Sequence, residues 1–389
     1  MSPDLLNGLL EGLLAAQQGL RAVLHALGLA PEVHGQPAWP WGHRIAAEML
    51  AVDAGHARQV LLSLLCAGAA LLALAVSLPF QRARPWLIAL AAALLVFAPW
   101  PQAHLLLAPA VPTSLHQSPT GFAAGGIVRG QAVYQQHCVR CHGADGRGEG
   151  PDAPQLAQWP PNLNGTLLWK RLDGELFWRV REGMHNRAGV QTMPGVGSAL
   201  RDEEIWDVLD YLQAHAAGQM LREAGTWDRP VRLPGMAVQC RHGRARQSRD
   251  LVGQRVRVAV AGPGVPLVAD DPRLVTLVAG ALPAGADAEC QPQGDPQHKR
   301  AVEQALALVL GVSAAELPGY QLIVDRAGWL RARGQPGKAA WSEDDLVCRA
   351  TAAPAPPVGA ATAPVDGLQA LIRRMDAEPV RLVRGGFPH

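Results

Sequence analysis

The stretch Cys138-Val139-Arg140-Cys141-His142 places two thiols one helical turn apart, with an imidazole directly after the second. This spacing is the attachment signature of a c-type haem: the thiols form thioethers with the two vinyl groups, and the imidazole becomes the proximal ligand of the iron. A Cys-x-x-Cys redox pair does not need the His, and the sequence holds no second Cys-x-x-Cys to complete a zinc site. The motif therefore predicts one covalently attached haem c, held by Cys138, Cys141 and His142.

Length and composition set the wider limits. A chain of 389 residues is long enough for two or three domains. Its formal net charge of +2 argues against a general nucleic-acid binder. Six cysteines are too few for a disulfide scaffold in a chain of this length, and haem attachment leaves Cys66, Cys240, Cys290 and Cys348 for other roles.

Residues 1–56 form an amphipathic N-terminal segment. Leucines between residues 4 and 29 are interrupted by Glu11, Gln17 and Arg21, which predicts a helix that lies on a membrane or packs on another part of the chain, with a third membrane span as the alternative. The aromatic residues of 37–41 suit the headgroup zone. Histidines at positions 34, 43, 56, 104 and 116 flank these segments without ligand spacing, so a copper site there is a weak interpretation.

Residues 57–110 are expected to form a two-helix transmembrane anchor. Val60 to Phe80 and Pro85 to Ala108 are both uncharged and long enough to cross a bilayer. Arg82 and Arg84 lie in the loop between them, and the next Lys or Arg is Arg129. The positive-inside rule therefore predicts that this loop is cytoplasmic and that the chain after residue 110 lies outside.

Residues 111–126, rich in Ser, Thr, Pro and Gly, are expected to be a linker, and residues 127–220 a haem-binding domain. Apolar spacing predicts three helices in that domain, over 127–136, 172–182 and 202–216. Residues 143–150 form a glycine-rich loop directly after the haem motif.

A haem that transfers electrons needs a ligand on the face opposite the His. Met193, in a Pro/Gly-containing loop before the last helix, is the preferred candidate, since its thioether is a soft, neutral donor. Met184, His185 and an open site are the alternatives.

The run from Arg129 to Ala217 resembles a class I cytochrome c. The motifs that carry this resemblance are Gly130 and Tyr134 in the first helix, the haem motif, Pro161-Asn162-Leu163, Met193-Pro194, Trp206 and Tyr211-Leu212. The resemblance implies an all-α domain in which the first and last helices cross, with Gly130 against Trp206 or Tyr211. It also implies that the Pro161 carbonyl accepts a hydrogen bond from His142, and that the haem is attached on the periplasmic side of a bacterial cytoplasmic membrane.

The segments 36–40, 109 and 118–122 are similar to the tail of copper-resistance D-type membrane proteins. The many earlier helices of such proteins are missing, so copper transport does not follow from this resemblance.

Residues 228–350 are predicted to form an α/β domain. Strands are expected at 256–260, 274–278, 320–325 and 328–332, with a helix at 299–310. This order resembles a thioredoxin-like domain, but no Cys-x-x-Cys follows the first core strand, so the domain is expected to be degenerate and without thiol catalysis. Cys240, Cys290 and Cys348 leave room for one disulfide that the sequence cannot pair. Residues 351–389 are expected to be an Ala/Pro linker and a basic tail, with a short helix over 368–375.

Together these features favour a membrane-anchored periplasmic cytochrome with one haem, which carries single electrons between redox partner proteins rather than converting a substrate. It could be a subunit of a larger membrane complex. One alternative is a non-catalytic copper-handling or oxidase-assembly protein with a structural or sensory haem and a partner-binding thioredoxin-like domain. A thiol oxidoreductase that uses Cys240, Cys290 or Cys348 is a weaker third possibility.

Overall fold

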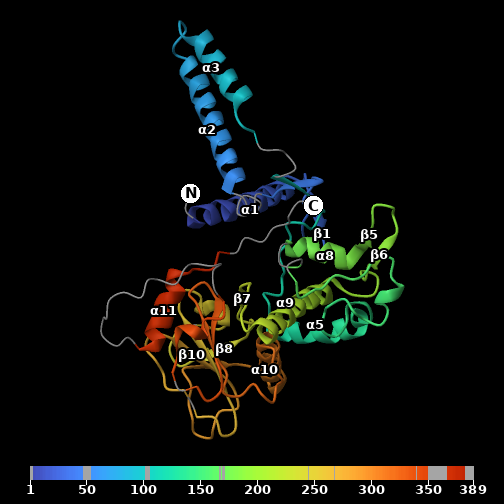
Figure 1. Ribbon diagram of the computed structural model, residues 1–389, viewed down its shortest axis with the longest axis vertical. Helices are drawn as coiled ribbons and strands as arrows, with labels where there is room; N and C mark the ends of the chain where they lie inside the picture. The colour runs from blue at the N-terminus through green and yellow to red at the C-terminus, as the bar shows by residue number, and fades with distance from the viewer. Residues whose placement is uncertain are drawn as a thin grey trace. The chain divides into compact units, whose positions relative to one another are not determined.

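The computed structural model describes residues 3–46, 54–100, 106–165, 168, 171–243, 245–266, 268–338, 340–348 and 366–381. The chain divides into two compact units. One contains the residues up to His116 together with a short segment that ends at Glu175; the other contains the rest of the chain from Gln117 onward. Figure 1 shows the elements of both units along the chain.

The first unit begins with α1 (Pro3–Ala26), as the leucine pattern predicted. Its inward face buries Leu10, Gln17 and Arg21, whereas large apolar side chains on the other face are exposed: Leu9, Leu20, Val23 and Leu27. Gln17 is fixed by its amide, which donates to the Ile45 carbonyl over 3.1 Å and accepts from the Ile45 N–H over 2.9 Å. The inward face of this helix therefore carries both apolar and polar side chains.

Two short antiparallel pairs also belong to this unit. They are β1 (Glu32–Val33) with β2 (Gln36–Pro37), and β3 (His43–Ile45) with β4 (Leu107–Pro109). Arg44 on β3 is buried and pairs with Glu175 over 2.8 Å. The segment expected to be a linker contributes to this core, because Thr113, Leu115 and His116 are buried. The predicted domain boundaries themselves stay a prediction.

The expectation of two transmembrane helices is wrong: the described residues contain one helix long and apolar enough to cross a membrane. This is Arg58–Ser77, within α2 (Ala54–Ser77). The second run forms only the 14-residue α3 (Arg84–Phe97), about 21 Å long at 1.5 Å per residue, against a hydrocarbon core of about 30 Å. It ends there because Ala98 precedes Pro99 and takes an extended ψ of 138°. The two helices pack through small residues, Ala70, Ala73 and Ala91.

Three helices match the sequence prediction: α5 (Ala124–His137), α8 (Asp173–Glu182), most of which lies in the second unit, and the long α9 (Asp202–Ala224). The short α6 (Val139–His142) and a 3₁₀ turn at Ala153–Gln155 lie between α5 and α8. The all-α expectation is wrong in one place, since β5 (Gly183–His185) and β6 (Gln191–Pro194) form an antiparallel hairpin where a loop was expected.

The crossing of α5 and α9 depends on Gly130. A Cβ added there would lie 1.9 Å from the Asp207 carbonyl oxygen, so only glycine lets the two backbones approach this closely. The expected neighbours Trp206 and Tyr211 lie on either side of that contact along α9, and the ring of Tyr211 packs at 5.2 Å on that of Tyr134, one helical turn after Gly130.

The rest of the second unit is a mixed seven-stranded sheet in the order β7-β13-β12-β9-β10-β11-β8. Strands β9, β10 and β11 run parallel, and β12 and β13 are antiparallel to their neighbours. Their bounds are β7 (Val231–Arg232), β8 (Val238–Cys240), β9 (Val256–Ala261), β10 (Val275–Gly280), β11 (Cys290–Pro292), β12 (Gln321–Val324) and β13 (Trp329–Gly334). The four strands expected from the sequence are confirmed.

Helices cover both faces of this sheet. α10 (Pro296–Leu310) joins a core with Val258 and Leu322, whereas α11 (Gly367–Ala377) packs with Ile323 on the opposite face. 3₁₀ turns at Ser248–Leu251 and Glu343–Asp345 close the connections. The helix expected at 368–375 is confirmed, while residues 349–365 and 382–389 of the expected linker and basic tail lie outside the described residues.

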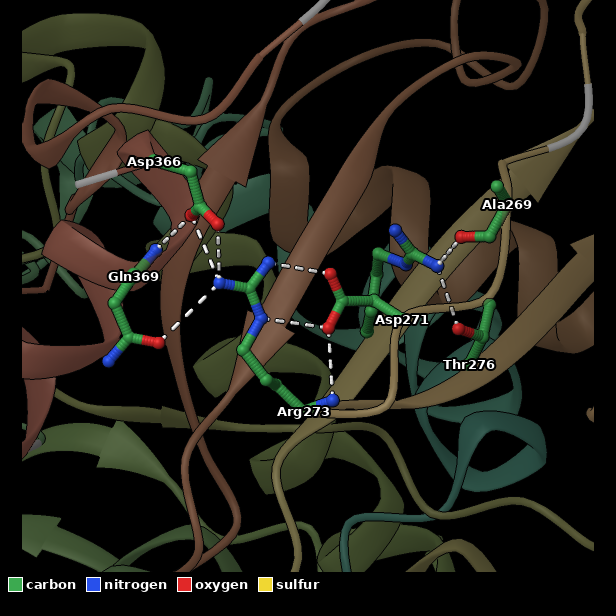
Figure 2. A network of polar contacts seen from close by, with 7 residues as sticks. Ala269, Asp271, Arg273, Thr276, Asp366 and Gln369 are labelled. Carbon is green, nitrogen blue, oxygen red and sulfur yellow. Dashed lines mark hydrogen bonds and ion pairs between the residues drawn. The ribbon is translucent and has the colours of Figure 1, made fainter. Parts of the chain in front are cut away.

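Two arginines hold α11 in place. Arg331, with none of its surface exposed, donates to the carbonyls of Met375 and Glu378 at the end of α11 over 3.3 and 2.7 Å. At the other end of α11, Figure 2 shows the Arg273 guanidinium between Asp271 and Asp366. Its Nη1 donates to the side-chain oxygens of Asp366 and Gln369, and its Nη2 donates to Asp271. These contacts fix both ends of the helix on the sheet.

Helices α5, α9 and α10 pack on one another, so the haem-motif helices and the sheet share one core. Ala217 and Leu221 of α9 lie in the same apolar cluster as Leu306 of α10. Gly218 makes this possible, because a Cβ there would lie 2.0 Å from the Leu308 carbonyl oxygen. The second unit is therefore continuous from the haem motif to the sheet.

Candidate haem site

The haem motif lies at the junction between α5 and α6. The N–H of Cys138 donates to the Tyr134 carbonyl and so caps α5, and the N–H groups of Cys141 and His142 both donate back to the Cys138 carbonyl, over 3.2 and 2.9 Å. This single turn brings both thiols and the imidazole together, as the sequence predicted. Neither thiol is in a disulfide.

The glycine-rich loop folds back over this turn. The N–H groups of Gly148, Gly150 and Asp152 donate to the carbonyls of His142, Cys141 and Arg140 in order, which satisfies the open end of α6. A Cβ at Gly150 would lie 2.2 Å from the Arg140 carbonyl oxygen, so the loop needs glycine there. The Tyr134 hydroxyl donates to the Gly143 carbonyl over 2.7 Å and ties the loop to α5.

An apolar cluster forms the wall beside the motif. Phe177 of α8 stacks on Trp206 of α9 with ring centroids 4.6 Å apart, and Cys138 and Val139 pack against the same cluster. Its other buried members are Tyr134, Leu163, Leu176, Leu200, Ile205, Val208, Leu209, Tyr211 and Leu212. These side chains come from several separate elements that meet at the motif, as a large apolar cofactor requires.

The protonation states fit haem attachment better than thiol redox chemistry. Burial and the neighbouring Cys141 raise the pKa of Cys138 to about 11, whereas reactive thiols have a lowered pKa. Burial lowers the pKa of His142, which favours the neutral ring that binds metal. Its buried Nδ1 has no hydrogen-bond partner in the described part of the chain, so this nitrogen can still form one hydrogen bond. The residues therefore fit a covalently bound haem with His142 as its ligand.

Pro161, the implied partner of His142, is exposed, and the hydrogen bond from Nδ1 to its carbonyl is not formed in this structure. The neighbouring Pro160 is buried, and its carbonyl faces Gly148 in the loop after the motif. The role of Pro161 as an orienting residue stays a prediction.

Met193, the expected sixth ligand, lies on β6 directly opposite Met184 on β5. Met193 is half-buried, whereas Met184 has 36% of its surface exposed and His185 is exposed. The hairpin therefore places the preferred candidate and its main rival side by side, with Met193 the more enclosed. The choice between them stays a prediction.

His215 is a half-buried polar residue near the haem motif that sequence reasoning missed. It lies one turn after Tyr211 on α9, and its ring nitrogen is 3.1 Å from the Gln219 amide. Burial and Arg222 lower its pKa to about 4, and a Cβ at Gly146 of the haem loop would lie 3.7 Å from its Nδ1. The signal was its i, i+4 spacing from Tyr211 on a helix already expected to face the core.

The remaining cysteines separate into two kinds. Cys240 and Cys290 are directly paired on β8 and β11 and form a disulfide, which resolves the pairing left open by the sequence. Cys348 is buried, and burial raises its pKa to about 11, so it is not a reactive thiol.

The flanking histidines do not form a metal site in the described residues, where no three His, Cys, Asp or Glu side chains gather as ligands. The side chains of His56 and His104 lie outside the described part of the chain.

Ion pairs surround a cavity of about 750 Å³ at the amino ends of β9 and β10. Arg241 pairs there with Asp270 over 3.0 Å, and Arg273 with Asp271 over 2.7 Å. Deeper in the sheet, Arg257 donates to the Ala269 carbonyl and the Thr276 hydroxyl (Figure 2). These charged side chains at the cavity thus pair with one another. They lie in the sheet part of the second unit and stabilise its fold.

Comparison with known proteins agrees with this geometry. The cytochrome c family matches residues 127–216, which therefore form a cytochrome c domain. A thiosulfate dehydrogenase of Allochromatium vinosum is 35% identical over 112 residues, 27% of this chain and 35% of the relative. A thiosulfate dehydrogenase of Stutzerimonas stutzeri is 30% identical over 146 residues, 36% of this chain and 41% of the relative.

The chain thus spans between a third and two fifths of the length of these curated relatives. Among solved structures, a reducing HAO-like protein complex of Kuenenia stuttgartiensis aligns with 34% of this chain and 58% of its own at 18% identity and a TM-score of 0.21, which is too low to carry an argument.

Proposed function

We propose that this protein is a membrane-anchored c-type cytochrome with one haem, which carries single electrons between partner proteins. The observation that carries the proposal is the Cys138–His142 turn: two free thiols and a neutral imidazole lie together beside an apolar wall, inside a domain that the cytochrome c family matches. A bound haem c supplies one-electron chemistry at iron.

The chain's own residues have separate tasks in this account. Cys138 and Cys141 would hold the porphyrin covalently, and His142 and Met193 would be the ligands of its iron. Phe177 and Trp206, stacked in the apolar cluster, would keep water away from the cofactor. Since no side chain here needs to give or take a proton from a substrate, the arrangement suits a carrier rather than a substrate-converting enzyme.

The membrane and its side are part of the proposal. Helix Arg58–Ser77 is long and apolar enough to span. The haem domain is proposed to lie in the periplasm because covalent haem attachment takes place there in the class I cytochromes that the domain resembles. With this single span, a cytoplasmic Arg82 would leave the haem domain on the cytoplasmic side, so the basic loop does not support the periplasmic orientation. The disulfide between Cys240 and Cys290 is in keeping with an oxidising compartment.

The sheet is proposed to be a degenerate thioredoxin-like domain that binds partners. Support comes from the run β13-β12-β9-β10, in which β9 and β10 are parallel and β12 and β13 antiparallel, with α10 before β12 and α11 after β13. Gly262-Pro263 follows β9 where a catalytic member would carry its cysteines, so thiol catalysis is not part of its role.

Oxidation of a reduced sulfur compound is a second candidate, favoured by the printed names of the two relatives. One experiment on the full chain, matured with haem, distinguishes the two hypotheses. Reduction of the haem by a small cytochrome or by membrane extracts, without reduction by thiosulfate, supports the carrier. Turnover of thiosulfate with an artificial acceptor, abolished by His142→Ala, supports the second candidate and rejects the first.

A further inference from the structure

The cavity at the amino ends of β9 and β10 is large enough to hold a small molecule. Its volume of about 750 Å³ lies within the range of ligand pockets, roughly 300–1,000 Å³. Residues next to different strands of the sheet meet around it: Arg241 after β8, Arg255 before β9, Arg273 before β10, Glu289 before β11 and Arg326 after β12. The cavity is therefore formed by the sheet itself and not by a single loop.

The carboxylates that line this cavity have partners. Asp270 pairs with Arg241 over 3.0 Å, and both oxygens of Asp271 accept from Arg273, as Figure 2 shows. Glu289 accepts from a backbone N–H of β10 over 2.7 Å. Two of the arginines of the cavity are therefore matched by its own acids, and the third acid is bound to the backbone.

Arg326 is a cation of the cavity without such a partner. Among the described residues, its exposed guanidinium has no ion pair and no hydrogen bond, although its carbonyl accepts from the Gly253 N–H over 2.8 Å. The residues from 228 onward that the structure does not describe include no Asp or Glu. The side chain is thus held at the cavity by its backbone and keeps its N–H donors open.

Arg255, across the cavity lining from Arg326, is matched only in part. Its Nη2 pairs with Asp376 of α11 over 2.5 Å, and that carboxylate is half exposed to solvent. Its other guanidinium nitrogens make no hydrogen bond in the described part of the chain. Four arginines and three carboxylates therefore line the cavity, and the excess positive charge belongs to Arg255 and Arg326.

This arrangement offers donors and acceptors to one ligand. Guanidinium groups bind the oxygens of a carboxylate or phosphate through charge-assisted hydrogen bonds. Asp270 and Glu289 each use one side-chain oxygen in the contacts above, so the other can accept from a hydroxyl. We propose that the cavity binds a small organic anion, whose carboxylate or phosphate group contacts Arg326 and Arg255 and whose hydroxyl contacts Asp270 or Glu289.

The site is separate from the haem chemistry, because none of the lining residues belongs to the apolar cluster beside the haem motif. The test uses the full chain matured with haem, with titration calorimetry and thermal unfolding at constant ionic strength. Malate or glycerol 3-phosphate should bind once per chain and raise the Tm, and the tighter of the two identifies the anionic group. Succinate, which lacks the hydroxyl of malate, should bind several-fold more weakly than malate.

Arg326→Gln should weaken the binding of the tighter anion by roughly tenfold or more, because it removes charge-assisted hydrogen bonds. Its Tm without ligand should match that of the wild type, since the side chain is exposed and unpaired. Arg300→Gln is the matched control, because it removes an exposed arginine of α10 that does not line the cavity, and it should bind as the wild type does.

Asp270→Asn should have the opposite effect. It releases Arg241 from one of its two carboxylates and should tighten anion binding several-fold, whereas Asp344→Asn, which removes an exposed acid outside the cavity, should change nothing. Equal losses of affinity in Arg326→Gln and Arg300→Gln would overturn the proposal, and so would the absence of binding by both malate and glycerol 3-phosphate. Binding of tetraglutamate alone would also overturn it, because the cavity would then be part of a surface for acidic peptides.

Discussion

Met184 and Met193 lie directly opposite each other across the β5–β6 hairpin, although nine positions separate them in the chain. The hairpin turns through Asn186, whose side chain accepts from the N–H groups of Ala188 and Val190 over 3.0 Å each. One rigid element thus presents two thioethers, of which Met193 is the more enclosed.

Met193→Ala should remove the Met-to-iron absorption of the oxidised haem and lower its midpoint potential by roughly one to a few tenths of a volt, since axial ligands set haem potentials over ~0.8 V. Met184→Ala is the matched control and should keep both. The measurements are visible spectroscopy and a redox titration. Loss of the band in Met184→Ala alone would assign the ligand to the other strand.

Gly130→Ala should destabilise the haem domain by about 1–3 kcal/mol or more, because its Cβ would meet the backbone of α9 at 1.9 Å. Gly125→Ala in the same helix is the control, since its nearest neighbour is the flexible end of Arg129 at 3.4 Å, and it should be neutral or slightly stabilising. Denaturant unfolding followed by haem absorbance measures both. Equal stability of the two variants would show that α5 and α9 do not cross at Gly130.

Replacing both Cys240 and Cys290 with Ala should lower the unfolding free energy of the second unit by up to about 4 kcal/mol, because the bond closes a loop with a sequence separation of 50 residues. A reductant should have the same effect on the wild type and none on the variant. Cys348→Ser, which alters a buried thiol outside any disulfide, should keep the sensitivity to reductant. Insensitivity of the wild type to reductant would mean that the bond is absent in solution.

His215 should make the second unit less stable in mild acid. Its folded-state pKa is about 4, below the unfolded value near 6.5, so the unfolded state binds more protons between these values. Stability is then complete above about pH 6.5 and falls by ~2–3 kcal/mol as the pH decreases toward 4. His215→Gln should flatten that part of the profile. An identical pH profile in the variant would show that the ring is not buried in its neutral form.

Much of the fold could be predicted from local patterns. The apolar spacing in 202–216 and the β-branched runs at 256–260 and 274–278 identified α9, β9 and β10, because patterns of this kind are typical of buried helices and buried strands. The helical turn at Cys138–His142 was predicted as well, since these residues are neighbours in the sequence, whereas the attachment of haem to them stays a prediction.

What the sequence could not give depends on contacts between distant residues. The pairing of Cys240 with Cys290 follows from the register of β8 against β11, which no local pattern records. The leucine pattern of α1 indicated an amphipathic helix but not that Arg21 would face inward. The sequence did contain a turn-forming residue for the hairpin, Asn186, and a helix-breaking residue after α3, Pro99. The apolar composition around Pro99 and the Pro and Gly residues around Met193 nevertheless favoured a long helix and a loop.

The most direct test of the account is covalent haem content. The full chain, produced with haem-maturation machinery, should migrate as one haem-stained band after denaturation, give a c-type pyridine haemochrome spectrum and show by mass a single haem per chain. Cys138→Ser with Cys141→Ser should abolish the stain, whereas Cys348→Ser should leave it unchanged. A chain that carries no covalent haem, or that keeps it without these two cysteines, would contradict the central claim.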